Sequence, residues 1–181
     1  RIAEDGWYDS RIIEIIRHAM EYVADTSDRH ASLYMATTEL GDLTLKQGLE
    51  QLMADGKIGS SVITALDRVA VRASDRTIGD NLSEIIRSLD LYGTISAWPD
   101  ADQARANLLR LESEAHDFIN MNRTTLASGG YYGTGIKTFL AWLANRVQEK
   151  EGDRQPDPRV HDADAVELTT WHSAKGREWP I

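Results

Sequence analysis

The sequence predicts an all-α fold that ends in a single strand. Through about residue 150, apolar side chains recur every three or four residues, which is the spacing of amphipathic helices. Polar capping residues, glycines and prolines divide this stretch into units of ordinary helix length. Residues 166–170 differ, because apolar and polar side chains alternate there as in a strand. With 181 residues, the chain is long enough for one well-filled core with a short appendage.

About seven helices are expected, and the first covers residues 7–24. Its apolar side chains share one face: Ile12, Ile15, Ile16, Ala19 and Val23. The polar step 25–28 ends this helix and offers N-caps for a second, which runs to about Glu39. Thr44 caps a third helix, and Gly56 closes it.

Four further helices are expected up to about residue 147. Ser60 or Ser61 caps the fourth, which runs to about Ala73. The fifth begins at Thr77 and carries a stripe up to Gly93, formed by Leu82, Ile85, Ile86 and Leu89. The sixth begins at Pro99 and Asp100. Its apolar side chains lie on one face: Leu108, Leu111, Ala115, Phe118 and Ile119. After a loop rich in glycine and tyrosine, the seventh is marked by Ile136, Phe139, Leu140, Leu143 and Val147.

The domain organisation follows from a change in composition near residue 150. Residues 1–150 form the helical domain, and residues 151–165 are charged, contain Pro156 and Pro158, and lack periodicity, so they are expected to be a linker. Residues 166–181 begin something else, because a lone strand needs partners for its backbone donors and acceptors. We therefore expect the chain to be a fragment whose strand joins a sheet supplied by sequence outside these limits.

Composition restricts the classes of protein to consider. The net charge of −9 disfavours a protein that binds nucleic acid through an extensive basic face, so any DNA contact is expected to be local. No apolar run approaches the roughly 20 residues that cross a bilayer, and no membrane partner is expected. The chain has no cysteine, which fits a cytoplasmic location.

The last residues carry the most specific signal. Residues 170–180 read Thr-Trp-His-Ser-Ala-Lys-Gly-Arg-Glu-Trp-Pro and follow the strand directly, where α/β sheets build ligand sites. This string resembles motif V of the UvrD/Rep-type superfamily 1 DNA helicases, roughly Thr-x-His-x-Ala-Lys-Gly-Leu-Glu-Phe-Pro. Arg177 departs from the usual Leu of that pattern. Trp171 and Trp179 look closer to the RecB/AddA-like helicase–nuclease branch.

The resemblance implies a role for each matching residue. Thr170 and His172 correspond to positions that contact the backbone of single-stranded DNA, and Lys175 adds positive charge beside phosphates. Gly176 permits a tight turn at the nucleotide, and Glu178 corresponds to the carboxylate that approaches the nucleotide ribose. The expected DNA-binding residues are thus Thr170, His172 and Lys175. The expected nucleotide-binding residues are Gly176 and Glu178.

The same resemblance extends to the helices. In these helicases, the mobile 2B accessory domain interrupts the second motor domain and precedes motif V, so residues 1–150 look like a 2B-like domain. Two weaker similarities support this: the helix end at residues 22–28, and residues 104–111, which resemble the family's Arg-x-Asn-Leu helix. The Gly-x-Gly hairpin with which the family's accessory domain grips DNA has only poor substitutes here, at residues 41–43 or 57–59.

Catalytic residues are not expected in this chain. It contains no Gly-x-x-x-x-Gly-Lys-Ser/Thr loop, so alone it cannot hydrolyse ATP by the P-loop mechanism. Its histidines have no metal-ligand spacing, and no metal site is expected. The resemblance implies ATP and Mg²⁺ as cofactors of the full-length enzyme only. The implied partners are single-stranded and junction DNA, together with the motor domains of the same polypeptide.

Two alternatives remain. The first is a stand-alone helical protein-interaction module. The second, a self-contained hydrolase, is poorly supported: residues 130–138 favour an interhelical loop over a phosphate loop, since no strand precedes them. Likewise, Glu112, Glu114 and Asp117 favour a solvated helix face over an acid–base pair.

Overall fold

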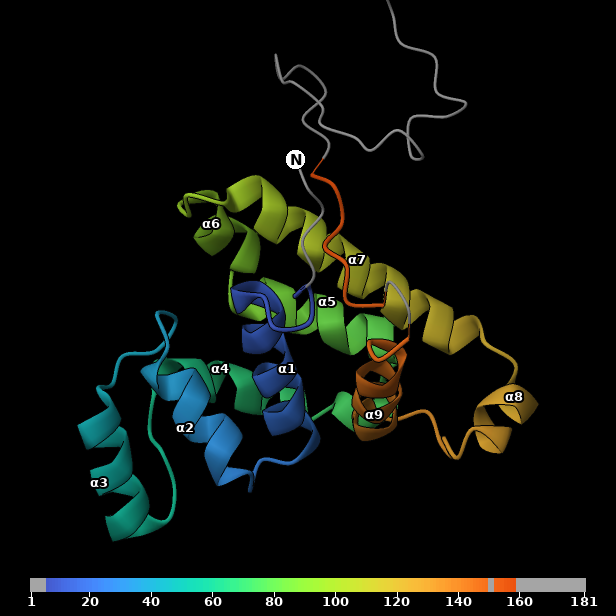
Figure 1. Ribbon diagram of the computed structural model, residues 1–181. Coiled ribbons are helices and arrows are strands. Elements are labelled where there is room, and N and C mark those ends of the chain that lie inside the picture. Colours follow the sequence, from blue (N-terminus) through green and yellow to red (C-terminus); the bar gives the residue numbers. More distant parts are fainter. Residues whose placement is uncertain (1–5, 150–151, 159–181) are drawn as a thin grey trace, which may run out of the picture.

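The computed structural model describes residues 6–149 and 152–158 (Figure 1). Within these residues the fold is all-α, as predicted, with no sheet. The described part contains nine α-helices and one 3₁₀ turn: α1 (Arg11–Ala24), α2 (Arg29–Thr37), α3 (Leu45–Asp55), α4 (Ser61–Ala70), η1 (Ala73–Asp75), α5 (Ile78–Ser88), α6 (Leu91–Ser96), α7 (Ala101–Asn120), α8 (Arg123–Ser128) and α9 (Ile136–Arg146). None of them is long and apolar enough to cross a bilayer. The strand predicted at 166–170 lies outside the described residues.

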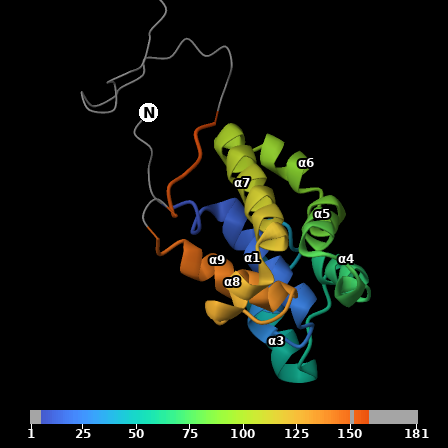
Figure 2. The same cartoon turned by 90° about the vertical axis from the view of Figure 1, so that its right-hand side faces the viewer.

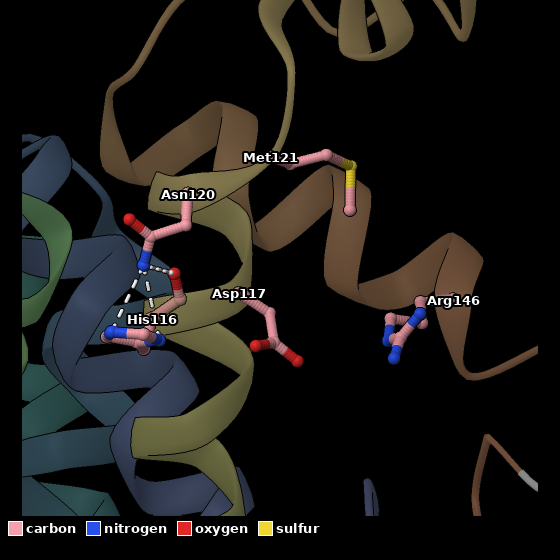
Figure 3. Close-up of a pocket in the computed structure, with 5 residues that line it drawn as sticks. All are labelled: His116, Asp117, Asn120, Met121 and Arg146. Atoms are coloured by element: carbon pink, nitrogen blue, oxygen red, sulfur yellow. Dashed lines mark hydrogen bonds between the residues drawn. The ribbon is translucent and has the colours of Figure 1, made fainter.

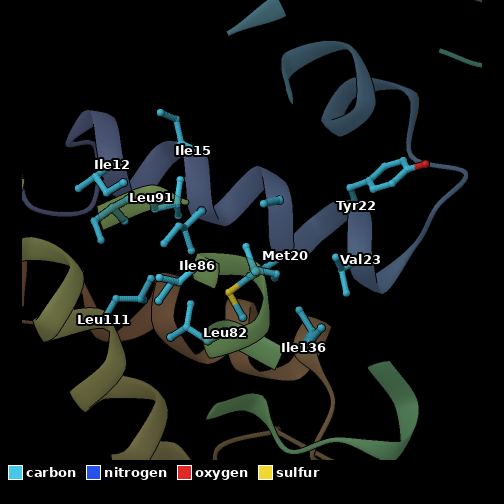
Figure 4. Packing of buried hydrophobic residues seen from close by; sticks show 14 of the residues in the cluster. Ile12, Ile15, Met20, Tyr22, Val23, Leu82, Ile86, Leu91, Leu111 and Ile136 are labelled. Atoms are coloured by element: carbon cyan, nitrogen blue, oxygen red, sulfur yellow. The ribbon is translucent and has the colours of Figure 1, made fainter. Parts of the chain in front are cut away.

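Helix α1 is the centre of the fold. The sequence predicts one buried face, but nine of its side chains are buried, and Ile13, Met20 and Tyr22 extend burial beyond the predicted face. A helix that is apolar on most sides needs neighbours on most sides. Accordingly, α2, α4, α5, α7 and α9 all pack against it. In Figure 4, Leu82, Ile86 and Leu111 lie below α1.

A cluster of aromatic rings joins the long helix α7 to α9. The Phe118 ring lies edge-on to Phe139 at 5.5 Å and tilted to Trp142 at 5.4 Å, both centroid to centroid. Aromatic pairs at these distances add about 0.5–1.5 kcal/mol beyond the area they bury. This cluster fixes α9 against α7, and that fixed pair carries the polar groups described below.

The predicted caps are mostly confirmed. Asp28 accepts from the Ala31 amide, while Thr44 and Thr77 each form a capping box with the third residue of the helix. Gly56 closes α3 in the left-handed conformation, with φ of 67°. Ser60 precedes α4 as predicted, but its hydroxyl donates to Asp42 instead of capping the helix.

The predicted number of helices is too low by two. The fifth predicted helix is split in two, because Asp90 adopts a left-handed conformation with φ of 45° and α6 starts in a new direction. The short helix α8 lies in the stretch expected to be a loop. Both additional helices have six residues, too few for apolar periodicity to reveal them.

Candidate functional site at the base of the helices

The site residues predicted from the terminal motif lie outside the described residues. Thr170, His172, Lys175, Gly176 and Glu178 fall within residues 159–181. Their roles therefore remain predictions. The candidate site that the structure itself defines lies instead at the base, which we define as the place where residues 6–8 and residues 152–158 meet beside α7.

Asp153 joins the two segments of the base. Its main-chain oxygen accepts from the amides of Gly6 at 3.0 Å and Trp7 at 2.9 Å. Its carboxylate accepts from the amides of Gly6 at 2.9 Å and Tyr8 at 2.8 Å. One residue thus satisfies three successive backbone donors from a segment about 145 positions away. The chain enters and leaves the helices at one place, as Figure 2 shows for the segment that runs beside α7.

Trp7 anchors the incoming segment. Its side chain is completely buried, and its indole N–H donates to the main-chain oxygen of Asn107 in α7 at 3.1 Å. Asn107 belongs to the stretch that resembles the helicase Arg-x-Asn-Leu helix, and it is itself buried. Burying a tryptophan side chain removes a large apolar surface from water, which makes this anchor strong.

Helix α7 also holds the outgoing segment. The Gln103 side chain donates to the Pro156 main-chain oxygen at 2.8 Å. The Arg110 guanidinium donates to the main-chain oxygens of Gly152 and Arg154 and lies 4.0 Å over the Trp7 ring. Burial lowers the pKa of Arg110 from its ordinary value, and the nearby Glu114 carboxylate opposes that shift. An arginine nevertheless stays charged in a protein.

Glu114 is buried, so the prediction of a solvated acidic face is wrong for this residue, whereas Asp117 is exposed as predicted. Its carboxylate accepts from Arg146 Nε of α9 at 2.6 Å and lies 3.6 Å from Arg110 Nη2. A carboxylate is tolerated at 7% exposure because two guanidinium groups compensate it. The arginine of another helix supplies this compensation, and helical spacing alone does not reveal it.

A shallow hollow of about 460 Å³ lies beside this network, between the end of α7 and α9 (Figure 3). It is lined by His116, Asp117, Asn120, Met121 and Arg146. The Asn120 amide lies 3.1 Å from a His116 ring nitrogen. In residues 6–149 and 152–158, no group of three or more acidic or histidine side chains is placed to hold a metal ion. The hollow therefore offers polar groups without a recognisable catalytic set.

The two poor substitutes for the DNA-gripping hairpin lie together in space. Asp42 accepts from the Ser60 hydroxyl at 2.5 Å and from the Ser61 amide at 3.3 Å, at the start of α4. The hydrogen bond from Ser60 lowers the pKa of the Asp42 carboxyl, and the Ser61 amide adds to this effect. A helix N-terminus attracts anions, but here the chain's own carboxylate lies at it. This turn is consequently poorly suited to bind a DNA phosphate.

The glycine-rich loop before α9 connects two helices, as predicted. It follows α8, and Lys137 Nζ pairs with the Asp25 carboxylate at 3.0 Å. Of the two loop tyrosines, Tyr131 is partly buried, whereas Tyr132 is 76% exposed.

Sequence comparison relates the chain to ATP-dependent helicase/nuclease proteins. No family model matches the chain. It is 26% identical over 156 residues to an ATP-dependent helicase/nuclease protein of Geobacillus thermodenitrificans, covering 86% of this chain and 12% of that protein. It is 28% identical over 106 residues to a protein of the same name from Carboxydothermus hydrogenoformans, covering 58% of this chain and 8% of that protein. The chain thus spans a small part of each relative, and the similarities support a relationship to superfamily 1 helicases at the level of the superfamily.

Proposed function

We propose that this chain is the helical accessory region of an ATP-dependent superfamily 1 DNA helicase of the helicase–nuclease type. In the full-length enzyme, residues 1–150 form a 2B-like arm, and residues 166–181 carry motif V into the motor. The arm regulates engagement of single-stranded and junction DNA, and the motor domains of the same polypeptide bind ATP and Mg²⁺. Such an enzyme works on DNA in the bacterial cytoplasm.

The closed base is the observation that carries this proposal. Residues 6–8 and Asp153 are hydrogen-bonded to each other, so the helices leave and rejoin the rest of a protein at one point. That geometry suits a domain inserted into another domain, because the insertion leaves the host chain nearly uninterrupted. The similarity to helicase/nuclease proteins agrees with it, because the first match covers 86% of this chain but only 12% of the relative.

The acidic character of the arm fits a regulatory role better than a DNA-gripping one. The chain carries a net charge of −9, and Asp42 lies at the helix end that could otherwise hold a phosphate. We therefore assign DNA and nucleotide contacts to Thr170, His172, Lys175 and Glu178, with Gly176 providing the turn between them.

The full-length protein tests this proposal. We expect its ATP hydrolysis to be stimulated by single-stranded DNA, because motif V links the DNA and nucleotide sites. Thr170→Ala and His172→Ala should each weaken this stimulation about tenfold or more while leaving unstimulated hydrolysis nearly unchanged. His116→Ala, on the exposed end of α7, is the matched control and should change neither rate. A full-length gene without a phosphate-loop motif would refute the proposal.

A protein-interaction module remains the second candidate, and a single surface favours it. Leu45, Leu49 and Met53 are spaced four residues apart on α3 and are 59%, 43% and 88% exposed. A stripe of this kind suits a partner helix. Replacing all three residues with serine tests this candidate. A protein-interaction module is favoured if the triple variant abolishes the protein's function in cells and the wild-type protein shows no DNA-stimulated ATP hydrolysis.

A further inference from the structure

The outgoing segment is held by side chains of α7 although its sequence predicts an extended linker. Carbonyl oxygens of three alternate residues, Gly152, Arg154 and Pro156, each accept a hydrogen bond from an α7 side chain. Unpaired carbonyls at the surface would otherwise bond to water, so these contacts replace solvent with one specific partner helix.

Arg110 makes most of these contacts at once. Its two terminal nitrogens donate to two carbonyls of the outgoing segment, and its planar face covers the Trp7 ring of the incoming segment. Only a guanidinium combines several fixed donors with a flat face that stacks on an aromatic ring. One side chain therefore touches both segments of the base.

The charges around Arg110 fix its orientation. Glu114, one turn further along α7, lies 3.6 Å from Arg110 and is itself held by Arg146 of α9 at 2.6 Å. The aromatic cluster of α7 and α9 holds these two helices together. Arg110 thus points at the outgoing segment from a rigid platform.

We infer that Arg110 is a clamp that makes residues 152–158 part of the helical body, so that they move together with residues 6–8 and α7. The boundary of the body then lies at or beyond residue 158 and not at residue 150, where the sequence places the start of a linker. Any movement of the arm relative to other domains has to occur outside residues 6–158. The inference depends on contacts within this chain and holds whether or not the full-length protein is a helicase.

A distance measurement between the two segments tests the clamp in the 181-residue chain. The chain has no cysteine, so Asp9→Cys and Asp157→Cys provide two specific labelling positions, both exposed. Electron paramagnetic resonance between spin labels there should give one narrow distance distribution. Adding Arg110→Gln should broaden it and shift it to longer distances. The thermal midpoint should change by only a few degrees, because no apolar side chain is removed and Arg146 still pairs with Glu114.

Hydrogen exchange gives an independent reading. The amides of Gly6, Trp7 and Tyr8 donate to Asp153 and should exchange about tenfold faster in Arg110→Gln, while buried amides of α1 keep their protection. Arg105→Gln is the matched control, since this exposed arginine of the same helix donates none of the hydrogen bonds that hold the described part of the outgoing segment. It should leave both measurements unchanged.

The outcomes separate clearly. A narrow, unshifted distribution in folded Arg110→Gln would overturn the clamp, and equal broadening in Arg105→Gln would do the same. If circular dichroism shows that Arg110→Gln is unfolded, Arg110→Lys decides. Lysine keeps the charge beside Glu114 but loses the flat fork, so a broadened distribution supports the clamp and a wild-type distribution refutes it.

Discussion

Helices α1 and α3 have similar lengths but opposite surroundings. Nine residues of α1 are buried, whereas Gly48 is the only buried residue of α3. Helix α1 needs no side-chain cap, and none is seen, because packing on most of its sides stabilises it. Helix α3 has a full capping box at Thr44 and Gln47 and a left-handed glycine at its end. The comparison indicates that tertiary packing determines one helix and local sequence determines the other.

The largest expected difference concerns core substitutions. Ile16→Ala in α1 removes a completely buried side chain and should lower the free energy of unfolding by about 2–5 kcal/mol. Leu49→Ala in α3 removes a side chain that is 43% exposed and should cost about 0.5 kcal/mol or less. Urea denaturation of both variants measures the contrast. Equal losses of unfolding free energy in the two variants would contradict the contrast between α1 and α3.

Removing the side-chain cap should destabilise α3 but not α1. Thr44→Ala deletes both the hydroxyl acceptor and its contact with Gln47, and should destabilise α3 by about 1 kcal/mol. Amide exchange should accelerate throughout α3 and stay unchanged in α1. Ser10→Ala provides the matched control, because Ser10 precedes α1 without capping it. Faster exchange in α1 after the Thr44 change would show that the two helices unfold together.

The smallest predicted effect is a change in the pKa of Asp25, at the C-terminal end of α1. Hydrogen bonds from Ser27, then from Lys137, lower the pKa of Asp25 from 3.8 to about 2. A lowered carboxyl pKa contributes stability that is present above the unfolded pKa of 3.8 and is lost as the pH falls towards 2. Ser27→Ala should raise the pKa of Asp25 more than Lys137→Gln does. Titration followed by NMR measures both, and an unchanged Asp25 pKa in Ser27→Ala would contradict the assigned cause.

The sequence predicts the helices better than it predicts their contacts. Periodicity and caps locate most helices, because Asp28, Thr44 and Thr77 act within three residues of themselves. The left-handed turn at Asp90 escapes prediction because nothing in its neighbours demands it, since aspartate adopts that conformation only occasionally.

The base is the part that sequence reasoning could not find. Arg110 bonds to carbonyl oxygens more than 40 residues away, and every residue type supplies such an acceptor, so no pattern marks the partners. Asp153 likewise accepts from backbone amides of an ordinary segment. The one usable signal is the pair of Trp7 and Arg110, a large apolar group and a cation that favour each other once folding brings them together.

Replacing the arm in the full-length protein tests the central claim most directly. Because Gly6 and Asp153 are hydrogen-bonded, a short glycine–serine linker can replace residues 7–152 without stretching the host chain. If the helices are an inserted arm, the shortened protein should fold and retain ATP hydrolysis stimulated by single-stranded DNA, with altered unwinding of duplex DNA. An insoluble protein, or a folded one without ATP hydrolysis, would contradict the account.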